Sequence, residues 1–265
     1  MMNILFIGAG KMATALASGL VRNKVFPFDN IAACDISAAA RESFSAATGL
    51  PCQDNPAALA GAADVIILAV KPQVAEAAAQ ALPPRKEGVI VISICAGINI
   101  RKLRSWFGTG RIVRVMPNTP LMVGKGASCY ALGSGADEAA AKIADQILSP
   151  LGKVWRVAED WLDAVTAISG SGPAYMFEFI EALRLAGIKL GLPPDLSLEL
   201  AIQTMRGAAE MLEQKLGSPE ELRIAVTSPG GTTAAALAVL EQADFRQTVL
   251  DMTQAARDRS VELGR

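Results

Sequence analysis

The segment SPGGTT at residues 228–233 combines residue types that suit the binding of an anion. A proline and two glycines lead into two threonines and an alanine-rich stretch, which predicts that a helix begins at about Gly231. The first N–H groups of a helix lack partners within it, and the helix dipole favours negative charge at that end. Hydroxyl groups of Ser228, Thr232 and Thr233 add further donors. We therefore predict a pocket for an anion, with N-capping as the alternative role of the threonines.

A second candidate site lies near the N-terminus, where Gly8, Gly10 and Ala13 form the pattern G-x-G-x-x-A. The pattern follows an apolar strand-like stretch and opens a helix-like one, as a dinucleotide-binding turn requires. Gly8 permits the tight turn, Gly10 lets a pyrophosphate approach the backbone, and Ala13 lets helix and strand pack closely. We expect a nicotinamide dinucleotide here, and a purely structural glycine turn is the alternative.

Asp35 follows the second expected strand and bears on which dinucleotide binds. A carboxylate at this place accepts a hydrogen bond from a ribose 2′-hydroxyl, which favours NAD(H). It repels the 2′-phosphate of NADP(H) unless a cation compensates, and Ser37 and Arg41 are the nearby candidates for binding that phosphate. The alternative is that residues 35–37 only form a turn and a helix cap. The sequence therefore leaves NADP(H) and NAD(H) open.

Composition restricts the chemistry further. The 265 residues include no histidine, which excludes Ser-His-Asp and Cys-His catalysis and every zinc site that contains histidine. No metal site is expected. The four cysteines form no CxxC pattern, so we interpret them as reduced thiols of a cytoplasmic protein. A net charge of −1, from 25 basic and 26 acidic residues, argues against nucleic acid and membrane partners.

The elements that must position these residues change in character along the chain. Apolar strand-like runs alternate with helix-like segments at first, and continuous apolar runs are typical of a parallel sheet covered on both faces. The expected strands are residues 3–7, 30–34, 64–70, 89–95, 111–116 and 154–158, and the main helices are residues 12–21 and 136–149. After about residue 160 only helices are expected, at residues 162–169, 174–190, 196–216, 219–227, 232–241 and 245–263.

This order predicts an α/β fold in which residues 1–159 form an N-terminal Rossmann-type dinucleotide-binding domain. Residues 160–265 are expected to form an all-α C-terminal domain for substrate binding and dimerisation. The helix at residues 174–190 is apolar on most of its circumference. Such a helix is buried either in a bundle or by another copy of the chain, and we favour a subunit interface.

Further segments carry polar or small residues in loops or turns that are candidates for contact with a ligand. Ligands of open α/β sheets bind beyond the carboxyl ends of strands, which points to two loops after the strands at residues 64–70 and 89–95. These loops contain Ala69, Val70, Lys71, Pro72, Cys95, Ala96 and Gly97. Asn118 is expected in a turn that lines the substrate or is merely structural. Residues 169–175, SGSGPAY, lack the strand and histidine of a nucleophile elbow, so we interpret them as a sharp Gly/Pro break between helices.

The segments IGAGKMA, AVKP, RVMPNTP, SGSGPAY and VTSPGGTT occur in that order, and together they resemble the pyrroline-5-carboxylate reductase family over essentially the whole chain. RVMPNTP and SPGGTT are far more specific than the glycine pattern. The resemblance implies reduction of 1-pyrroline-5-carboxylate to L-proline by NAD(P)H, the last step of proline biosynthesis. It also implies a homodimer through the C-terminal helices, often assembled into a ring of dimers.

The resemblance also implies site residues. Those implied to hold the nucleotide are Gly8, Ala9, Gly10, Lys11, Met12, Ala13, Asn55, Ala69, Val70, Lys71, Pro72, Cys95, Ala96 and Gly97, and those for the substrate are Ser228, Thr232 and Thr233, with the Gly231 amide. Thr233 is our candidate for a catalytic hydroxyl at the ring nitrogen. The chain departs from the family before SPGG, where Ile224 replaces a usual carboxylate. Any chemical role of Tyr175 or Lys71 stays open.

Two other functions remain as alternatives. A reductase of another small imine or 2-oxo acid would share the architecture, but such enzymes usually rely on a lysine or aspartate on the long interdomain helix. Residues 174–190 offer no obvious candidate in the first half of that helix. A dinucleotide-binding protein without catalysis is the second alternative, and the intact SPGGTT segment argues against it.

Overall fold

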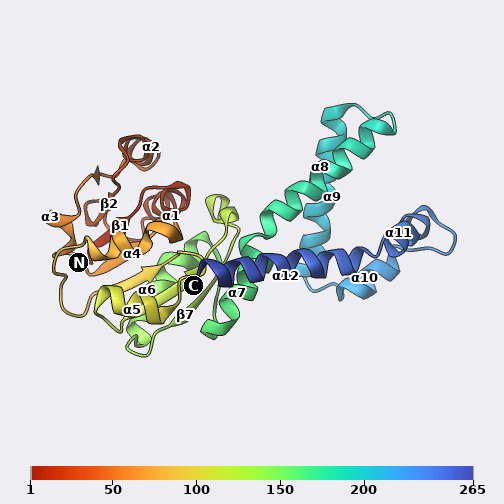
Figure 1. Cartoon of the computed structure of the whole chain (residues 1–265). Coiled ribbons are helices and arrows are strands. Elements are labelled where there is room, and N and C mark those ends of the chain that lie inside the picture. The colour runs from red at the N-terminus through yellow and green to blue at the C-terminus, as the bar shows by residue number, and fades with distance from the viewer. Residues whose placement is uncertain (1, 265) are drawn as a thin grey trace. The chain divides into compact units, whose positions relative to one another are not determined.

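The chain forms two compact units in a computed structural model that describes residues 2–264 (Figure 1). The first unit comprises the residues up to Ser171 together with the segment from Ala255 onward, and the second is Gly172–Gln254. The sequence predicts a dinucleotide-binding domain at residues 1–159 and a domain for substrate binding and dimerisation at residues 160–265. This division by function stays a prediction.

An eight-stranded sheet forms the centre of the first unit, in the order β3-β2-β1-β4-β5-β6-β7-β8. The strands are β1 (Ile4–Ile7), β2 (Ile31–Cys34), β3 (Cys52–Gln53), β4 (Val65–Leu68), β5 (Ile90–Ser93), β6 (Ile112–Met116), β7 (Gly126–Leu132) and β8 (Gly152–Arg156). The strand order reverses at β1, which has β2 on one side and β4 on the other. Open parallel sheets bind ligands beyond the carboxyl ends of their strands at such a switch point.

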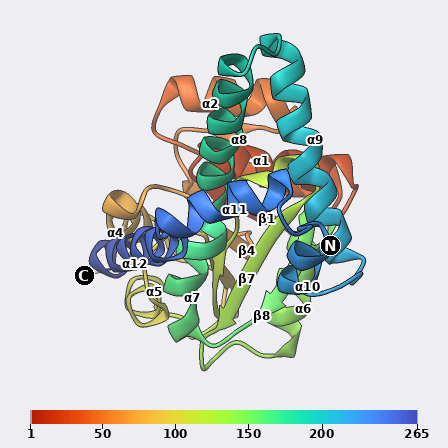
Figure 2. The ribbon, with the colours of Figure 1, turned by 90° about the vertical axis from the view of Figure 1, so that its right-hand side faces the viewer.

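The expectation of a parallel sheet holds for β1 to β6 and is wrong for the last two strands. β7 pairs antiparallel with β6, and β8 pairs parallel with β7, so both run against the rest of the sheet (Figure 2). β7 was not expected from the sequence. Its mixture of small and polar residues, GASCYAL, gives neither a continuous apolar run nor a clear alternation.

Helices cover both faces of the sheet in the first unit. They are α1 (Lys11–Arg22), α2 (Ala38–Thr48), α3 (Ala57–Ala60), α4 (Pro72–Gln80), α5 (Ile100–Phe107), α6 (Glu138–Leu148) and α7 (Leu162–Val165). Ile4 and Phe6 of β1 face the core that contains residues of α1, α2 and α6, whereas Leu5 faces the core of α3, α4, α5 and α7. Because both faces are buried, the central strands read as continuous apolar runs.

The second unit is helical, and its helices are α8 (Gly172–Lys189), α9 (Pro194–Glu213), α10 (Pro219–Ala225), α11 (Thr232–Gln242) and α12 (Phe245–Leu263), the last of which continues into the first unit. Helices α8 and α9 lie side by side (Figures 1 and 2). The Ser197 hydroxyl donates to the Arg184 carbonyl at 2.8 Å. Phe177 of α8 is 66% exposed, and other large apolar side chains of α8 and α9 are exposed with it. This apolar face suits a subunit interface.

Candidate active site

The turn between β1 and α1 has the backbone that the glycine pattern predicts. Gly8 adopts a φ of +102°, and its N–H donates to the Cys34 carbonyl at 2.8 Å. A Cβ atom at Gly8 would lie 2.7 Å from the Ala69 carbonyl oxygen and 2.8 Å from a Val70 methyl. Glycine is therefore required here both by the backbone angle and by the close approach of the loop after β4.

Gly10 occupies the N-cap position of α1, and no side chain caps that helix. A Cβ at Gly10 would meet no protein atom within 4 Å, so the space in front of the first helical amides is open. Ala13, one turn into the helix, is fully buried against the sheet. An open glycine at an uncapped helix start is a cradle that a pyrophosphate fits. The residues present therefore suit a dinucleotide.

Asp35 braces the glycine turn through both oxygens of its carboxylate. One oxygen accepts the Ala9 N–H and the other accepts the Ser37 N–H, each at 2.8 Å. The Ser37 hydroxyl also caps α2, as the turn-and-cap alternative predicts. The Arg41 guanidinium donates to the carbonyls of Asp35 and Ile36 at 2.9 and 3.1 Å, so a cation lies at the end of β2.

The other expected nucleotide contacts lie on loops after β4 and β5 and before α3. Lys71 is exposed at the N-cap of α4, and Pro72 is the first helical residue. Asn55 accepts the Ala57 N–H at 2.8 Å and so opens α3. Cys95 points inward: its Sγ contacts the Val70 carbonyl at 3.2 Å, and burial raises the pKa of the thiol to about 11. The loop after β5 is therefore not suited to meet a cofactor through the Cys95 thiol.

A polar cluster around one buried arginine was not predicted from the sequence. Arg114 on β6 is 5% exposed, and its guanidinium lies 3.0 Å from an Asp163 oxygen and 3.4 Å from a Glu159 oxygen. The Ser260 hydroxyl of α12 donates to the same Asp163 oxygen at 2.8 Å. The one signal in the sequence is a charged residue in the middle of an apolar strand, IVRVM.

The Asn118 side chain is hydrogen-bonded to the protein backbone through both its nitrogen and its oxygen. Its Nδ2 donates to the Ser169 carbonyl at 3.0 Å, and its Oδ1 accepts the Ala127 N–H at 2.8 Å. Pro173 has no N–H, so it cannot satisfy the Ser169 carbonyl four residues earlier, and Asn118 takes that role.

The expected sharp break between helices at residues 169–175 is wrong, because the structure has a wide helical turn there. The segment Thr166–Gly170 forms a π-helical turn in which the Ser171 N–H donates to the Thr166 carbonyl at 2.8 Å. Ser171 keeps helical angles, and α8 begins at Gly172. A single wide turn accommodates the proline, and the backbone stays helical.

The SPGGTT segment opens α11 as predicted. Gly231 is the N-cap with no side-chain hydrogen bond, and Thr232 is the first helical residue. A Cβ at Gly231 would collide with the Ser228 hydroxyl, which places that hydroxyl against the start of the helix. Within the described part of the chain, neither the Thr232 nor the Thr233 hydroxyl has a hydrogen-bond partner. The threonines therefore do not cap the helix, and their hydroxyls are available to a ligand.

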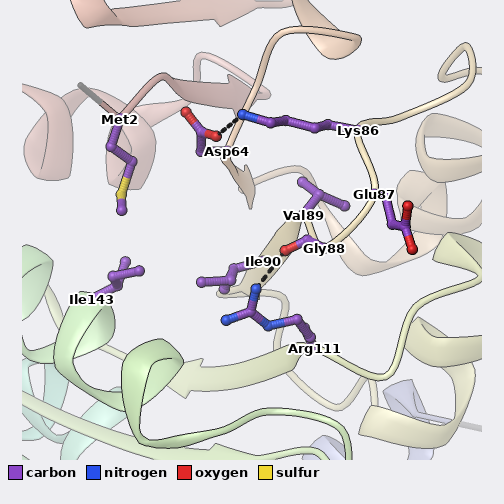
Figure 3. A pocket seen from close by; sticks show the side chains of 9 residues that line it. All are labelled: Met2, Asp64, Lys86, Glu87, Gly88, Val89, Ile90, Arg111 and Ile143. Atoms are coloured by element: carbon purple, nitrogen blue, oxygen red, sulfur yellow. Dashed lines mark hydrogen bonds and ion pairs between the residues drawn. The ribbon is translucent and has the colours of Figure 1, made fainter.

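A cavity of about 410 Å³ lies at the opposite edge of the sheet, before β4, β5 and β6 (Figure 3). Asp64 pairs with Lys86 there, and Arg111 donates to the Gly88 carbonyl at 2.7 Å. The Lys86 ammonium lowers the pKa of the Asp64 carboxyl. Because this hollow lies at the amino ends of the strands, it is the wrong edge of an α/β sheet for the dinucleotide.

Residues 2–264 contain neither a cluster of metal ligands nor a helix that could cross a membrane. No three His, Cys, Asp or Glu side chains among them gather as a metal ion would require. None of the helices in that range combines the length and apolar character needed to span a bilayer.

Comparisons with known proteins find similarity over both parts of the chain. Residues 159–263 match the family model for pyrroline-5-carboxylate reductase dimerisation, and residues 3–97 match the model for NADP oxidoreductase, coenzyme F420-dependent. The chain is 43% identical to a pyrroline-5-carboxylate reductase of Glycine max, covering 97% of this chain and 94% of that one. It is 41% identical to that of Pseudomonas aeruginosa, covering 98% and 96%. A crystal structure of the Plasmodium falciparum enzyme with NADP bound matches with a TM-score of 0.92 at 34% identity, covering 100% and 98%.

Proposed function

The chain belongs to the pyrroline-5-carboxylate reductase family, and we propose that it reduces 1-pyrroline-5-carboxylate to L-proline with NADPH or NADH. The observation that carries the proposal is the 43% identity to a relative that matches 97% of the chain. The fold agrees with it, since a Rossmann-type unit with a fitting dinucleotide cradle is joined to a helical unit that matches a dimerisation model.

The cofactor would be held by the residues around the glycine turn and the neighbouring loops. The amides at the start of α1, left open by Gly10, bind the pyrophosphate. The loops at residues 69–72 and 95–97 hold the nicotinamide half, and Asn55 and Asp35 lie on the adenosine side. When bound, the reduced nicotinamide supplies a hydride to the carbon of a C=N bond.

The substrate carboxylate is bound by the start of α11. The amides of Gly231, Thr232 and Thr233 donate to it, and the helix dipole favours its charge by roughly 0.3–1 kcal/mol at an exposed site. The Ser228 hydroxyl adds a donor. Neutral donors suit this substrate, because its ring nitrogen is cationic when the imine is protonated and an arginine would repel it.

Thr233 is the proposed catalytic residue. Its hydroxyl is half-buried and free of protein partners within the described residues, so it is able to contact the ring nitrogen. A protonated imine is already a good electrophile, and the chain has no histidine to act as a stronger acid. The hydroxyl orients the imine and holds its proton, which contributes on the order of 10²-fold to the rate.

The dimerisation match supports a homodimer, and we propose that the second unit forms the interface through the exposed apolar face of α8 and α9. A higher ring of dimers is a further part of this proposal. The four cysteines of the chain are free thiols, and two of them are buried. Free thiols suit a reducing compartment such as the cytoplasm, where we propose that the protein is located.

The test is a turnover assay with 1-pyrroline-5-carboxylate and each reduced nucleotide, followed by loss of nicotinamide absorbance. Thr233→Ala is expected to lower kcat on the order of 10²-fold, while Thr233→Ser retains most of it and nucleotide affinity is unchanged. Thr248→Ala is the matched control, because the only partner of this exposed hydroxyl among residues 2–264 is the Asp244 carbonyl. Absence of turnover with both nucleotides would refute the proposed function. A kcat/KM within about twofold of wild type for Thr233→Ala would refute only the role of that hydroxyl.

A further inference from the structure

The last turn of α12 lies directly against the loop that follows β5. Gly97 has a φ of +76°, and a Cβ there would lie 2.5 Å from the Ser260 carbonyl oxygen and 2.9 Å from the Gly264 nitrogen. A Cβ at Gly264 would in turn collide with the Gly97 carbonyl. Two glycines thus bring the backbones into contact, and each is required by the other segment.

A hydrogen-bonded network that contains two buried residues, Ser260 and Arg114, fixes this turn of α12 in place. Ser260 is 2% exposed, and it is the buried residue of a helix whose other residues are exposed or half-buried. Its hydroxyl donates to an Asp163 oxygen at 2.8 Å, and the buried Arg114 guanidinium donates to the same oxygen at 3.0 Å. Buried charges are stable only when paired and hydrogen-bonded, so the network strongly specifies where Ser260 lies.

The same network continues to the other end of the loop. Arg114 also pairs with Glu159 at 3.4 Å, and a Glu159 oxygen accepts the Ile100 N–H at 2.6 Å, at the start of α5. The segment from Cys95 to Ile100 is therefore fixed at Gly97 by the turn of α12 that contains Ser260, and at Ile100 by Glu159. Arg114 connects these two contacts. No atom of this network lies on a residue assigned to the cofactor.

We propose that Ser260, through Asp163 and Arg114, is a positioning residue for the loop at residues 95–97, and so for the nicotinamide half of the cofactor. This inference rests on the proposed function, since it assumes that the loop meets the nicotinamide. Ser260 acts through the backbone of α12 on Gly97. Loss of the Ser260 hydroxyl weakens the contact between α12 and the loop at Gly97. The Arg114–Asp163 ion pair and the glycine turn at Gly8 keep their partners.

The experiment compares two probes that bind different parts of the site. Ser260→Ala is expected to raise the Kd of NADPH on the order of tenfold, the effect of losing one hydrogen bond to a charged group. The Kd of adenosine 2′,5′-bisphosphate, which lacks the nicotinamide, is expected to stay within about twofold. Hydrogen exchange of the amides at residues 95–98 is expected to speed up, with β4 unchanged. Ser105→Ala is the matched control, because its exposed hydroxyl bonds a carbonyl of α5.

An NADPH affinity within about twofold of wild type would overturn the proposal. Equal weakening of both probes would also overturn it, because a general loss of structure does not distinguish the two halves of the nucleotide. If Ser260→Ala does not fold, Gly264→Ala carries the same comparison by pushing the last turn away from Gly97. Wild-type protein that binds neither these probes nor NADH would instead overturn the cofactor site, and this inference with it.

Discussion

Gly8 and Gly10 are predicted to respond in opposite ways when each is given a methyl group. They stand two residues apart in one turn, yet a Cβ at Gly8 meets protein at 2.7 Å and a Cβ at Gly10 meets nothing within 4 Å. Gly8→Ala should therefore damage the fold, and Gly10→Ala should damage nucleotide binding alone.

The cost at Gly8 has two parts. A non-glycine residue at positive φ costs about 1–2 kcal/mol, and forcing a methyl group into packed surroundings costs about 1–3 kcal/mol. The sum of roughly 2–5 kcal/mol corresponds to a fall in Tm of roughly 4–20 °C for a unit of this size.

The effect at Gly10 falls on the ligand instead. Its φ of −74° and ψ of 179° suit alanine, and the small loss at an N-cap is offset by the stiffer unfolded chain, so Tm should stay within about 3 °C. The methyl group would occupy the space that we propose for the pyrophosphate. Loss of one or two charge-assisted hydrogen bonds raises the nucleotide Kd by roughly 10–10³-fold.

Thermal unfolding and a fluorescence titration with NADPH, applied to both variants, give the answer. The reasoning fails if Gly10→Ala binds NADPH within about twofold of wild type, since the open space before α1 would then not be where the phosphates lie. It also fails if Gly8→Ala unfolds at the wild-type temperature, because the left-handed backbone and the short approach to the β4 loop would then not be real constraints.

Three further predictions follow from single contacts. Arg41→Ala is expected to raise the KM for NADPH about tenfold and that for NADH less than twofold, and equal changes in both would contradict a role at the 2′-phosphate. Asn118→Ala leaves the Ser169 carbonyl and the Ala127 N–H unpaired, so denaturant unfolding should show a loss of about 2–4 kcal/mol; a loss below about 0.5 kcal/mol would contradict this. Burial raises the pKa of Cys95 to about 11 from 9.0, so its contribution to stability is complete below pH 9.0 and is lost as pH rises toward 11. Unfolding measured across that range should show a smaller fall in Cys95→Ala, and an equal fall would contradict the assignment.

The elements that the sequence predicts well are those whose pattern is set locally. The stretch at residues 64–70 becomes β4 (Val65–Leu68), because a strand covered on both faces must be apolar throughout. The helix expected at residues 245–263 is found as Phe245–Leu263. The helix start at Gly231 follows from alanine after glycine, which is also a local preference.

The elements that sequence reasoning misses owe their form to distant partners. β7 is a strand because β6 and β8 pair with it, and Gly126 is required by the close approach of Leu121 and the Leu151 carbonyl. The Arg114 network joins residues 45, 49 and 97 positions apart, and no spacing in the sequence relates them. The only signal in the sequence is that Arg114 is a single charged residue in an apolar strand, which indicates that it needs hydrogen-bonding partners inside the protein.

Asp35 shows why residue type at the right position does not settle nucleotide preference. A carboxylate offers about four lone-pair sites, and the amides of Ala9 and Ser37 use two of them. The remaining sites still accept a ribose hydroxyl, so bracing the turn and binding NADH are compatible. A 2′-phosphate bound here would meet both the Asp35 charge and the Arg41 guanidinium, which lies at the end of β2. The preference therefore depends on whether Arg41 leaves its two carbonyl partners to pair with the phosphate, which is the balance that Arg41→Ala measures.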